Sequence, residues 1–192
     1  MKKYTLLIYL IAHIQMAFAQ KDNTCISGVY LSYTDYINNN LTHSINTKIE
    51  GNSFGFIPFS KTIKVVTPDS TLKFNTGSIW GYKDCTGTYR YSPDVELLSP
   101  EDYYKIEENG GERELTIYSS VFDGGAEYFF STGLNLPIHR LNMKHLEYDF
   151  GGLFPKFIKE AKKLNKKKDG LSTRDKNGHF TINTIYKETI LR

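Results

Sequence analysis

Four aromatic side chains stand at alternate positions in two neighbouring segments. Trp80 and Tyr82 are two residues apart, and Tyr89 and Tyr91 repeat this spacing. Because successive side chains of a strand point to opposite faces, each pair would share one face. A hairpin would join the pairs into a row that either stacks against a sugar or peptide, or packs the core beneath a helix. Arg90 would then lie on the opposite, more solvated face.

The two cysteines, Cys25 and Cys85, could form a disulfide or supply a catalytic thiol. A disulfide in an exported chain would close a loop of about 60 residues and stabilise the fold by roughly 4 kcal/mol. A catalytic thiol needs a neighbouring base. No histidine lies near Cys85 in the sequence, so we expect the Cys25–Cys85 disulfide.

Other catalytic chemistry has little support. The histidines after residue 19 lack the spacing of metal ligands, no Gly-x-Ser-x-Gly motif is present, and the glycines fall in turns instead of phosphate loops. Carboxylates are plentiful in the middle of the chain: Glu101, Asp102, Glu107, Glu108, Glu112, Glu114, Asp123 and Glu127. A pair could hydrolyse a glycosidic bond, but such residues are more commonly solvated. We expect no catalytic residue, metal or cofactor.

The first nineteen residues resemble a cleavable signal peptide. Lys2 and Lys3 precede an apolar run, and Ala17-Phe18-Ala19 supplies a small-x-small cleavage pattern. The alternative is an uncleaved anchor, but the run is shorter than the ~20 residues that span a bilayer. We therefore expect residues 20–192 to form a single exported domain in the periplasm, at the cell surface or in the medium, with no transmembrane segment.

Charge is distributed unevenly along the chain. Residues 20–155 hold 11 basic and 17 acidic residues, a net charge of −6, whereas residues 156–192 hold 11 basic and 4 acidic residues, a net charge of +7. The basic part contains a lysine cluster: Lys159, Lys162, Lys163, Lys166, Lys167 and Lys168. These lysines would bind an anionic surface or form the solvated face of a helix. Nucleic acid fits an exported domain poorly.

Residues 54–132 alternate between apolar and polar side chains and are interrupted by glycine-containing turns, the pattern of sequential antiparallel hairpins. We expect strands at 62–67, 71–74, 78–83, 88–91, 103–108, 112–118, 119–122 and 127–131. The fold class is therefore predicted to be α+β, an antiparallel β-meander of six to eight strands with C-terminal helices packed on one face.

Helices are predicted mainly from residue 141 to 192. Asn142 is a suitable N-cap for a helix that reaches Phe150. A second helix runs from Pro155 to Gly170, with Phe154, Phe157, Ile158, Ala161 and Leu164 as its buried stripe. Ile182, Ile185, Tyr186 and Ile190 predict a last helix, although β-branched residues fit a strand nearly as well. Near the start, Ser32 and Asp35 have capping-box spacing for a short helix over 33–38.

Several segments together resemble a group of small exported proteins of Bacteroidetes-type bacteria with no assigned function. They are residues 28–38, 79–84, 89–90, 128–131 and 137–146. The resemblance covers nearly all of the chain after residue 19 and implies a bacterial envelope or secreted location. It implies no catalytic residue.

The sequence thus favours a non-enzymatic envelope or secreted module that binds a macromolecule, either a glycan or another protein. Trp80, Tyr82, Tyr89 and Tyr91 are its candidate binding residues. The alternatives are a small secreted hydrolase that uses sheet carboxylates, and a structural subunit that would leave a large apolar patch uncovered.

Mass spectrometry of the protein after export checks two of these expectations. We expect an N-terminus at Gln20, and two cysteines that react with a thiol-alkylating reagent only after reduction. An intact Met1 would contradict cleavage, and alkylation without reduction would contradict the Cys25–Cys85 bond.

Overall fold

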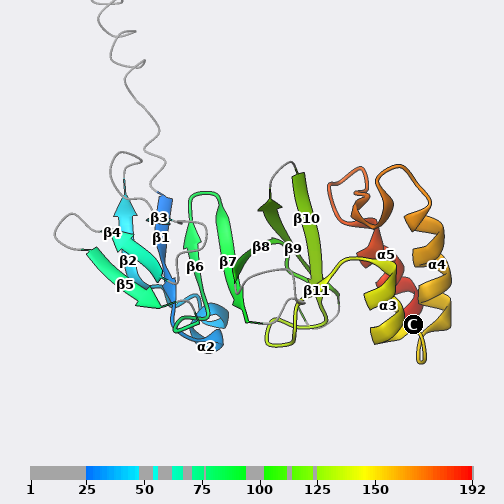
Figure 1. Ribbon diagram of the computed structural model, residues 1–192, viewed down its shortest axis with the longest axis horizontal. Coiled ribbons are helices and arrows are strands. Elements are labelled where there is room, and N and C mark those ends of the chain that lie inside the picture. The colour runs from blue at the N-terminus through cyan, green and yellow to red at the C-terminus, as the bar shows by residue number, and fades with distance from the viewer. Residues whose placement is uncertain are drawn as a thin grey trace, which may run out of the picture.

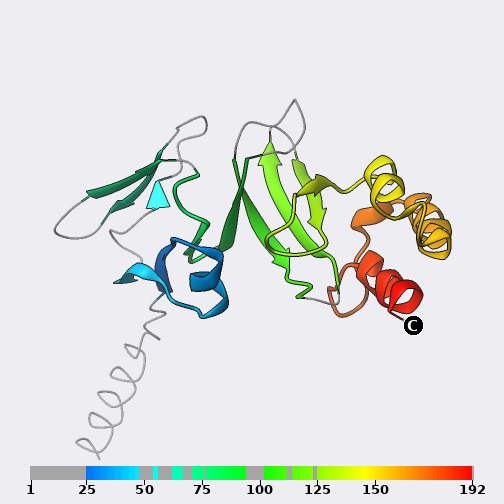
Figure 2. The same cartoon turned by 90° about the horizontal axis from the view of Figure 1, so that it is seen from below.

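The computed structural model describes residues 25–47, 54–55, 62–66, 71–75, 77–93, 102–111, 114–122 and 125–191. The predicted signal peptide at 1–19 lies outside these ranges. The described residues form a large sheet between a small sheet at one end of the molecule and three C-terminal helices at the other (Figure 1). The view from below shows the same order (Figure 2).

The large sheet has eight strands among the described residues, in the order β11-β10-β9-β8-β7-β6-β1-β2. Every pairing in it is antiparallel. The strands are β1 (Cys25–Tyr30), β2 (Thr42–Thr47), β6 (Gly81–Asp84), β7 (Gly87–Ser92), β8 (Asp102–Glu108), β9 (Thr116–Phe122), β10 (Gly125–Ser131) and β11 (His139–Arg140). From β6 to β11 the chain makes the predicted meander.

Two predictions about strands need correction, and one hairpin was missed. The strands expected at 62–67 and 71–74 do pair with each other, but as β4 (Thr62–Val66) and β5 (Thr71–Asn75) they form a second sheet with β3 (Phe54–Gly55). The separate strands expected at 112–118 and 119–122 are one strand, β9. The hairpin of β1 and β2 was not predicted. Val29 and Tyr30 are both buried, so β1 lacks the alternation that identifies a half-exposed strand.

The helices begin where local signals predict. The Asn142 side chain accepts a hydrogen bond from the His145 backbone N–H at the start of α3 (Met143–Phe150). Pro155 opens α4 (Pro155–Asn165), and Ser32 and Asp35 form the predicted capping box of α2 (Tyr33–Ile37). The helix expected to reach Gly170 ends earlier, at Asn165. A turn follows it and leads into the short 3₁₀ helix η1 (Gly170–Ser172).

The last segment is helical, as α5 (Thr181–Ile190), despite its β-branched residues. Asn183 holds this helix against the sheet, because its buried side chain bonds the chain just before β9. Its Oδ1 accepts from the Leu115 N–H at 3.0 Å, and its Nδ2 donates to the Leu115 carbonyl at 2.9 Å and to Glu108 Oε1 at 2.6 Å. Tertiary hydrogen bonds therefore stabilise a helix that local propensity left undecided.

One hydrophobic cluster, which we call the helix core, joins the helices to the sheet. The buried stripe of α4 packs there with side chains from α3, η1, β9, β10, α5 and the residues just before β9 and α5. The helix core consists of Leu115, Ile117, Phe130, Leu146, Phe150, Phe157, Ile158, Ala161, Leu164, Leu171, Phe180 and Ile182. The expected α+β arrangement, an antiparallel sheet with C-terminal helices on one face, is confirmed. The helices cover only the β9–β10 end of that face.

Another part of this face lies beneath the small sheet. Tyr89 pairs with Lys105 of β8, which pairs with Ser119 of β9. Ser119 pairs with Tyr128 of β10. Because paired residues project from the same face, Tyr89 and Tyr128 share one face. Tyr89 packs against a second cluster, the small-sheet core, formed by Val29, Ile63, Val65, Ile79, Tyr82 and Tyr103, whereas Tyr128 packs on the helix core.

Candidate functional site

Three of the four predicted binding aromatics pack in or against the small-sheet core. Tyr82 is only 6% exposed, and its ring stacks on Tyr89 at a centroid distance of 4.6 Å. Tyr91 and Tyr103 have ring centroids 5.4 Å apart. The layer that covers these rings is the small sheet, not the lysine-rich helix that the sequence suggested. Their placement favours core packing over stacking against a ligand.

Trp80 lies apart from these tyrosines. It precedes β6, and its ring stacks on Tyr36 of α2 at 4.4 Å, with Tyr30 and Tyr33 also in contact. The Asn109 side-chain amide donates to the Tyr36 hydroxyl at 3.0 Å. Burial, reinforced by the nearby Tyr30, raises the pKa of Tyr36. Trp80 therefore anchors α2 to the sheet, and the predicted row of four rings does not form.

The prediction that Arg90 lies on a solvated face is wrong, because its side chain is buried. It is 6% exposed, and it donates to the Tyr118 hydroxyl at 2.8 Å and to the Leu136 carbonyl at 2.7 Å. The Tyr118 hydroxyl also bonds Ser131 Oγ at 2.8 Å. Among the described residues Arg90 forms no ion pair. The alternating-strand pattern could not reveal this contact, because Leu136 lies in the loop between β10 and β11.

The backbone near Cys85 agrees with the expected disulfide. Gly28 of β1 pairs with Lys83 of β6, so the antiparallel ladder brings the start of β1 beside the turn that holds Cys85. Cys85 is not a free thiol. A sulfur held in a disulfide is not a nucleophilic thiol, so the catalytic-thiol alternative has no support here. The Cys25–Cys85 pairing stays a prediction.

The described carboxylates on β8, on β10 and just before β9 form hydrogen bonds and ion pairs with the residues around them. Glu107 accepts from Ser119 Oγ at 2.7 Å and pairs with Lys105 and Arg174, both at 3.4 Å. Glu108 accepts from the Phe180 backbone N–H at 2.9 Å. Glu114 pairs with Lys187, and Glu127 pairs with Arg140. These contacts fix the sheet to the loops and helices around it, which gives the carboxylates structural roles. Glu101, Glu112 and Asp123, and the side chain of Asp102, lie outside the described parts of the structure.

Two of the histidines, His139 and His145, lie close together. The rings of His139 and His145 are 5.7 Å apart, and His145 Nδ1 lies 3.0 Å from the Arg140 carbonyl. Within the described ranges, no three histidine, cysteine or acidic side chains are grouped so that they could hold a metal ion.

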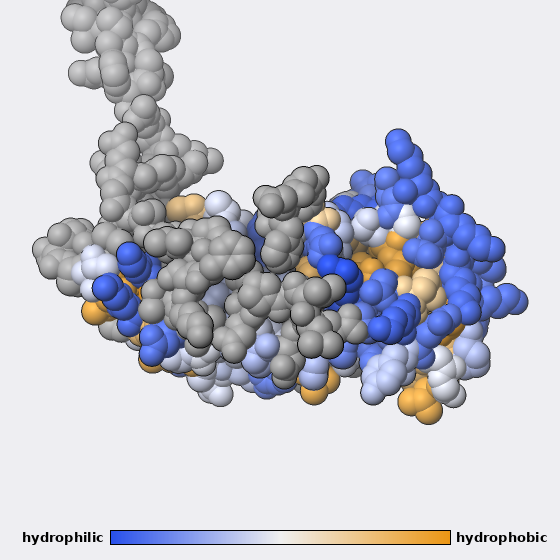
Figure 3. All heavy atoms as spheres, viewed as in Figure 1, coloured by the Kyte–Doolittle hydropathy of each residue, from blue (hydrophilic) through white to orange (hydrophobic). Residues whose placement is uncertain are grey.

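The lysines of α4 form the most strongly charged surface of the described chain. We call Lys156, Lys159, Lys162, Lys163 and Lys166, together with Lys167 and Lys168 in the turn after α4, the lysine surface; all seven are exposed. Figure 3 shows hydrophilic side chains concentrated over this end of the molecule. Glu160 is the only acidic residue among residues 155–168. The same helix thus buries an apolar stripe and displays cations on its other side.

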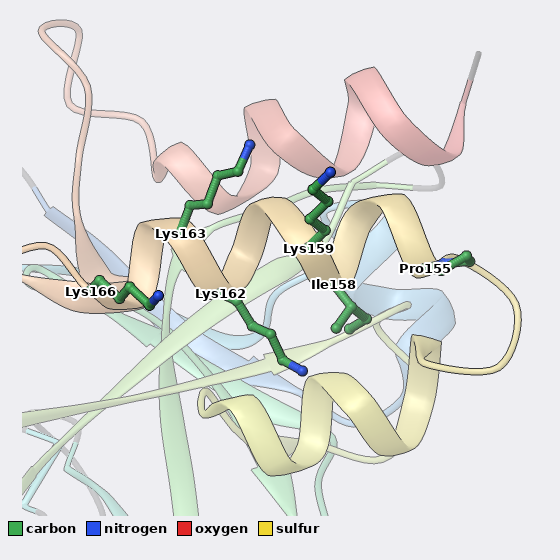
Figure 4. A pocket seen from close by; sticks show the side chains of 6 residues that line it. All are labelled: Pro155, Ile158, Lys159, Lys162, Lys163 and Lys166. Atoms are coloured by element: carbon green, nitrogen blue, oxygen red, sulfur yellow. The ribbon is translucent and has the colours of Figure 1, made fainter.

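A shallow hollow of about 430 Å³ lies on the lysine surface, lined by Pro155, Ile158, Lys159, Lys162, Lys163 and Lys166. Figure 4 shows Lys159 and Lys163 extending toward α5, while Lys162 extends toward α3. Lys162 pairs with Glu147 at 2.6 Å. The hydrogen bond from Lys163, 2.7 Å long, lowers the pKa of Glu160.

Two of these cations remain available for a partner. Lys159 and Lys166 form no ion pair with any described residue, and they lie seven positions apart on α4. At a rise of about 1.5 Å per residue, their backbone positions are separated by about 10 Å along the helix axis. The surface therefore offers repeated positive charge over about two helical turns, with an apolar base at Ile158.

Compared with known proteins, the chain matches no family model, no curated protein and no solved structure. In the described part of the chain, none of the helices combines the length and the apolar character needed to cross a bilayer. The candidate site is accordingly assigned from its own geometry.

We predict that Arg90→Met lowers the free energy of unfolding by about 2–3 kcal/mol, because hydrogen bonds to a buried charged group are lost. Urea denaturation measures this change. Arg140→Met is the matched control, since Arg140 forms an exposed ion pair and such pairs contribute about 0–1 kcal/mol. Equal stability of the two variants would contradict the structural role given to Arg90.

Proposed function

We propose that this chain is an exported, non-enzymatic module that binds an acidic glycan of a bacterial envelope. The lysine surface supports this proposal most strongly, since seven exposed lysines lie on one helix and the turn that follows it. The signal-peptide pattern at 1–19 and the resemblance to small exported bacterial proteins support the location. The protein acts in the periplasm, at the cell surface or in the medium.

An acidic glycan fits this surface better than a folded protein does. Lysine side chains are flexible point charges that do not impose one geometry on an anion. Specific protein interfaces bury about 800 Å² on each partner around a well-packed core of apolar and aromatic side chains. The α4 hollow instead offers lysines around Ile158 and Pro155. A linear polymer with repeated negative charges can follow the helix and contact several lysines in turn.

A hydrolase would need a different arrangement. Glycoside hydrolysis uses two carboxyl groups about 5–10 Å apart on either side of the bond that breaks. Of the three hollows that the structure describes, the one on the lysine surface has no carboxylate in its lining. Each of the other two has a single carboxylate among its lining residues, Asp149 in one and Asp169 in the other. The binding function therefore has the stronger support.

The lysine surface is tested with polygalacturonate as an acidic polymer and dextran as a neutral one. We expect the protein to bind polygalacturonate at low ionic strength, more weakly as salt screens the charges, and not to bind dextran. The combined variant Lys159→Gln, Lys163→Gln and Lys166→Gln should bind at least about tenfold more weakly, because each lysine near an anionic surface contributes about 1 kcal/mol.

A charge-matched control separates the lysine surface from overall charge. Lys64, Lys73 and Lys83 lie in or beside the small sheet, at the far end of the molecule from α4. Their combined substitution by Gln removes the same charge and should change the affinity by less than about threefold. Failure of the wild-type protein to bind, or an equal loss in both triple variants, would contradict the proposal.

A further inference from the structure

A second hollow lies at the C-terminal end of α4. Its volume is about 430 Å³, and its lining comes from β10, the start of α3 and the segment from Asn165 to Ser172. We call it the end hollow. Lys166 lines the first hollow and Lys167 lines the end hollow, so the two are adjacent along the chain. A polymer that follows the lysine surface past Lys166 comes next to Lys167, which lines the end hollow in the turn after α4.

The base of the end hollow is apolar and firmly held. Tyr128, Leu141 and Met143 line it, and all three are half-buried side chains that pack on the helix core. The Tyr128 ring contacts Phe180 edge to face at 5.3 Å. Figure 3 shows hydrophobic side chains around the start of α3, beside the hydrophilic side chains over the end of α4. This base offers an apolar surface to the C–H face of a sugar ring.

The rim of the end hollow is polar, and a hydrogen-bonded turn positions it. The Gly170 N–H donates to the Lys167 carbonyl at 3.0 Å, and Ser172 Oγ donates to the Asp169 carbonyl at 2.6 Å. Gly170 has a φ of +54°, a conformation that glycine adopts without steric cost. This turn places the side chains of Asn165, Lys167, Lys168 and Asp169 around one opening.

The chemistry of this rim suits an acidic sugar. The two ammonium groups, of Lys167 and Lys168, can bind a carboxylate, while the Asn165 amide and the Asp169 carboxylate can bond ring hydroxyls. Cations outnumber the single anion, so the rim as a whole attracts negative charge. We infer that the end hollow is a subsite for one hexuronic acid residue of the bound glycan. This inference rests on the proposed function.

Asp169 gives the inference a sharp test. If binding were only electrostatic, Asp169→Ala would remove a negative charge and strengthen the binding of an acidic oligosaccharide. If Asp169 accepts hydrogen bonds from sugar hydroxyls, the same change weakens binding. Asn165→Ala tests the neighbouring amide without changing the charge. Both side chains are exposed, so neither change is expected to disturb the fold.

The experiment measures binding of trigalacturonate by calorimetry, with polygalacturonate binding measured in parallel. We expect Asp169→Ala and Asn165→Ala each to weaken trigalacturonate binding at least threefold, while both variants still bind polygalacturonate. Glu188→Ala is the control, because it removes one exposed acidic residue of α5 that does not line the end hollow.

The outcomes separate the inference from the function on which it rests. Stronger or unchanged binding of trigalacturonate by Asp169→Ala, as for Glu188→Ala, overturns the subsite but leaves the lysine surface intact. Binding of neither ligand by the wild-type protein overturns both. Selective weakening by Asp169→Ala and Asn165→Ala supports the subsite.

Discussion

Burial of the apolar stripe of α4 connects the fold of this protein to its proposed function. Phe157, Ala161 and Leu164 are almost inaccessible to solvent, and they pack between α3, α5 and the β9–β10 end of the large sheet. The lysines of α4 lie off its apolar stripe, so burial of the stripe leaves the lysines exposed to solvent. The lysine surface and the end hollow both depend on this orientation.

The large sheet provides one face for two separate layers. The small sheet covers the tyrosines at one end, and the helices cover Ile117 and Phe130 at the other. Between them lies the polar contact of Glu107 with Lys105, Ser119 and Arg174. On the opposite face the loop between β10 and β11 packs through Ile138 on a buried cluster with Tyr104, Tyr118 and Phe129. Buried Arg90 adds hydrogen bonds from the strands to the same loop.

The sequence predicts the elements whose signals are local. The N-cap Asn142, the opening Pro155 and the periodic stripe of α4 define two helices, and glycine-containing turns separate the strands of the meander. It does not predict which strands share a sheet, because β4 and β5 carry the same alternation in either sheet. It also misses β1, whose two faces are both covered.

The candidate site could be predicted only in part. The lysines could be recognised from their number and their positions off the apolar stripe of α4, and they form the surface on which the proposed function rests. The positions of the four aromatic residues along the chain did not show that their rings lie in different places. Trp80 precedes β6, so its ring meets α2 instead of continuing the row with Tyr82. The end hollow is lined both by Tyr128 and by the turn after α4, which are distant in sequence.

The most direct test of this account is the free energy of unfolding of Phe157→Ala, measured by urea denaturation beside Lys159→Ala on the exposed side of the same helix. The account predicts a loss of about 3–5 kcal/mol for Phe157→Ala, because a large buried ring is replaced by a cavity. It predicts a change within about 0.5 kcal/mol for Lys159→Ala. Equal, small changes in both variants would show that the α4 stripe is not buried, and would contradict the orientation on which the lysine surface depends.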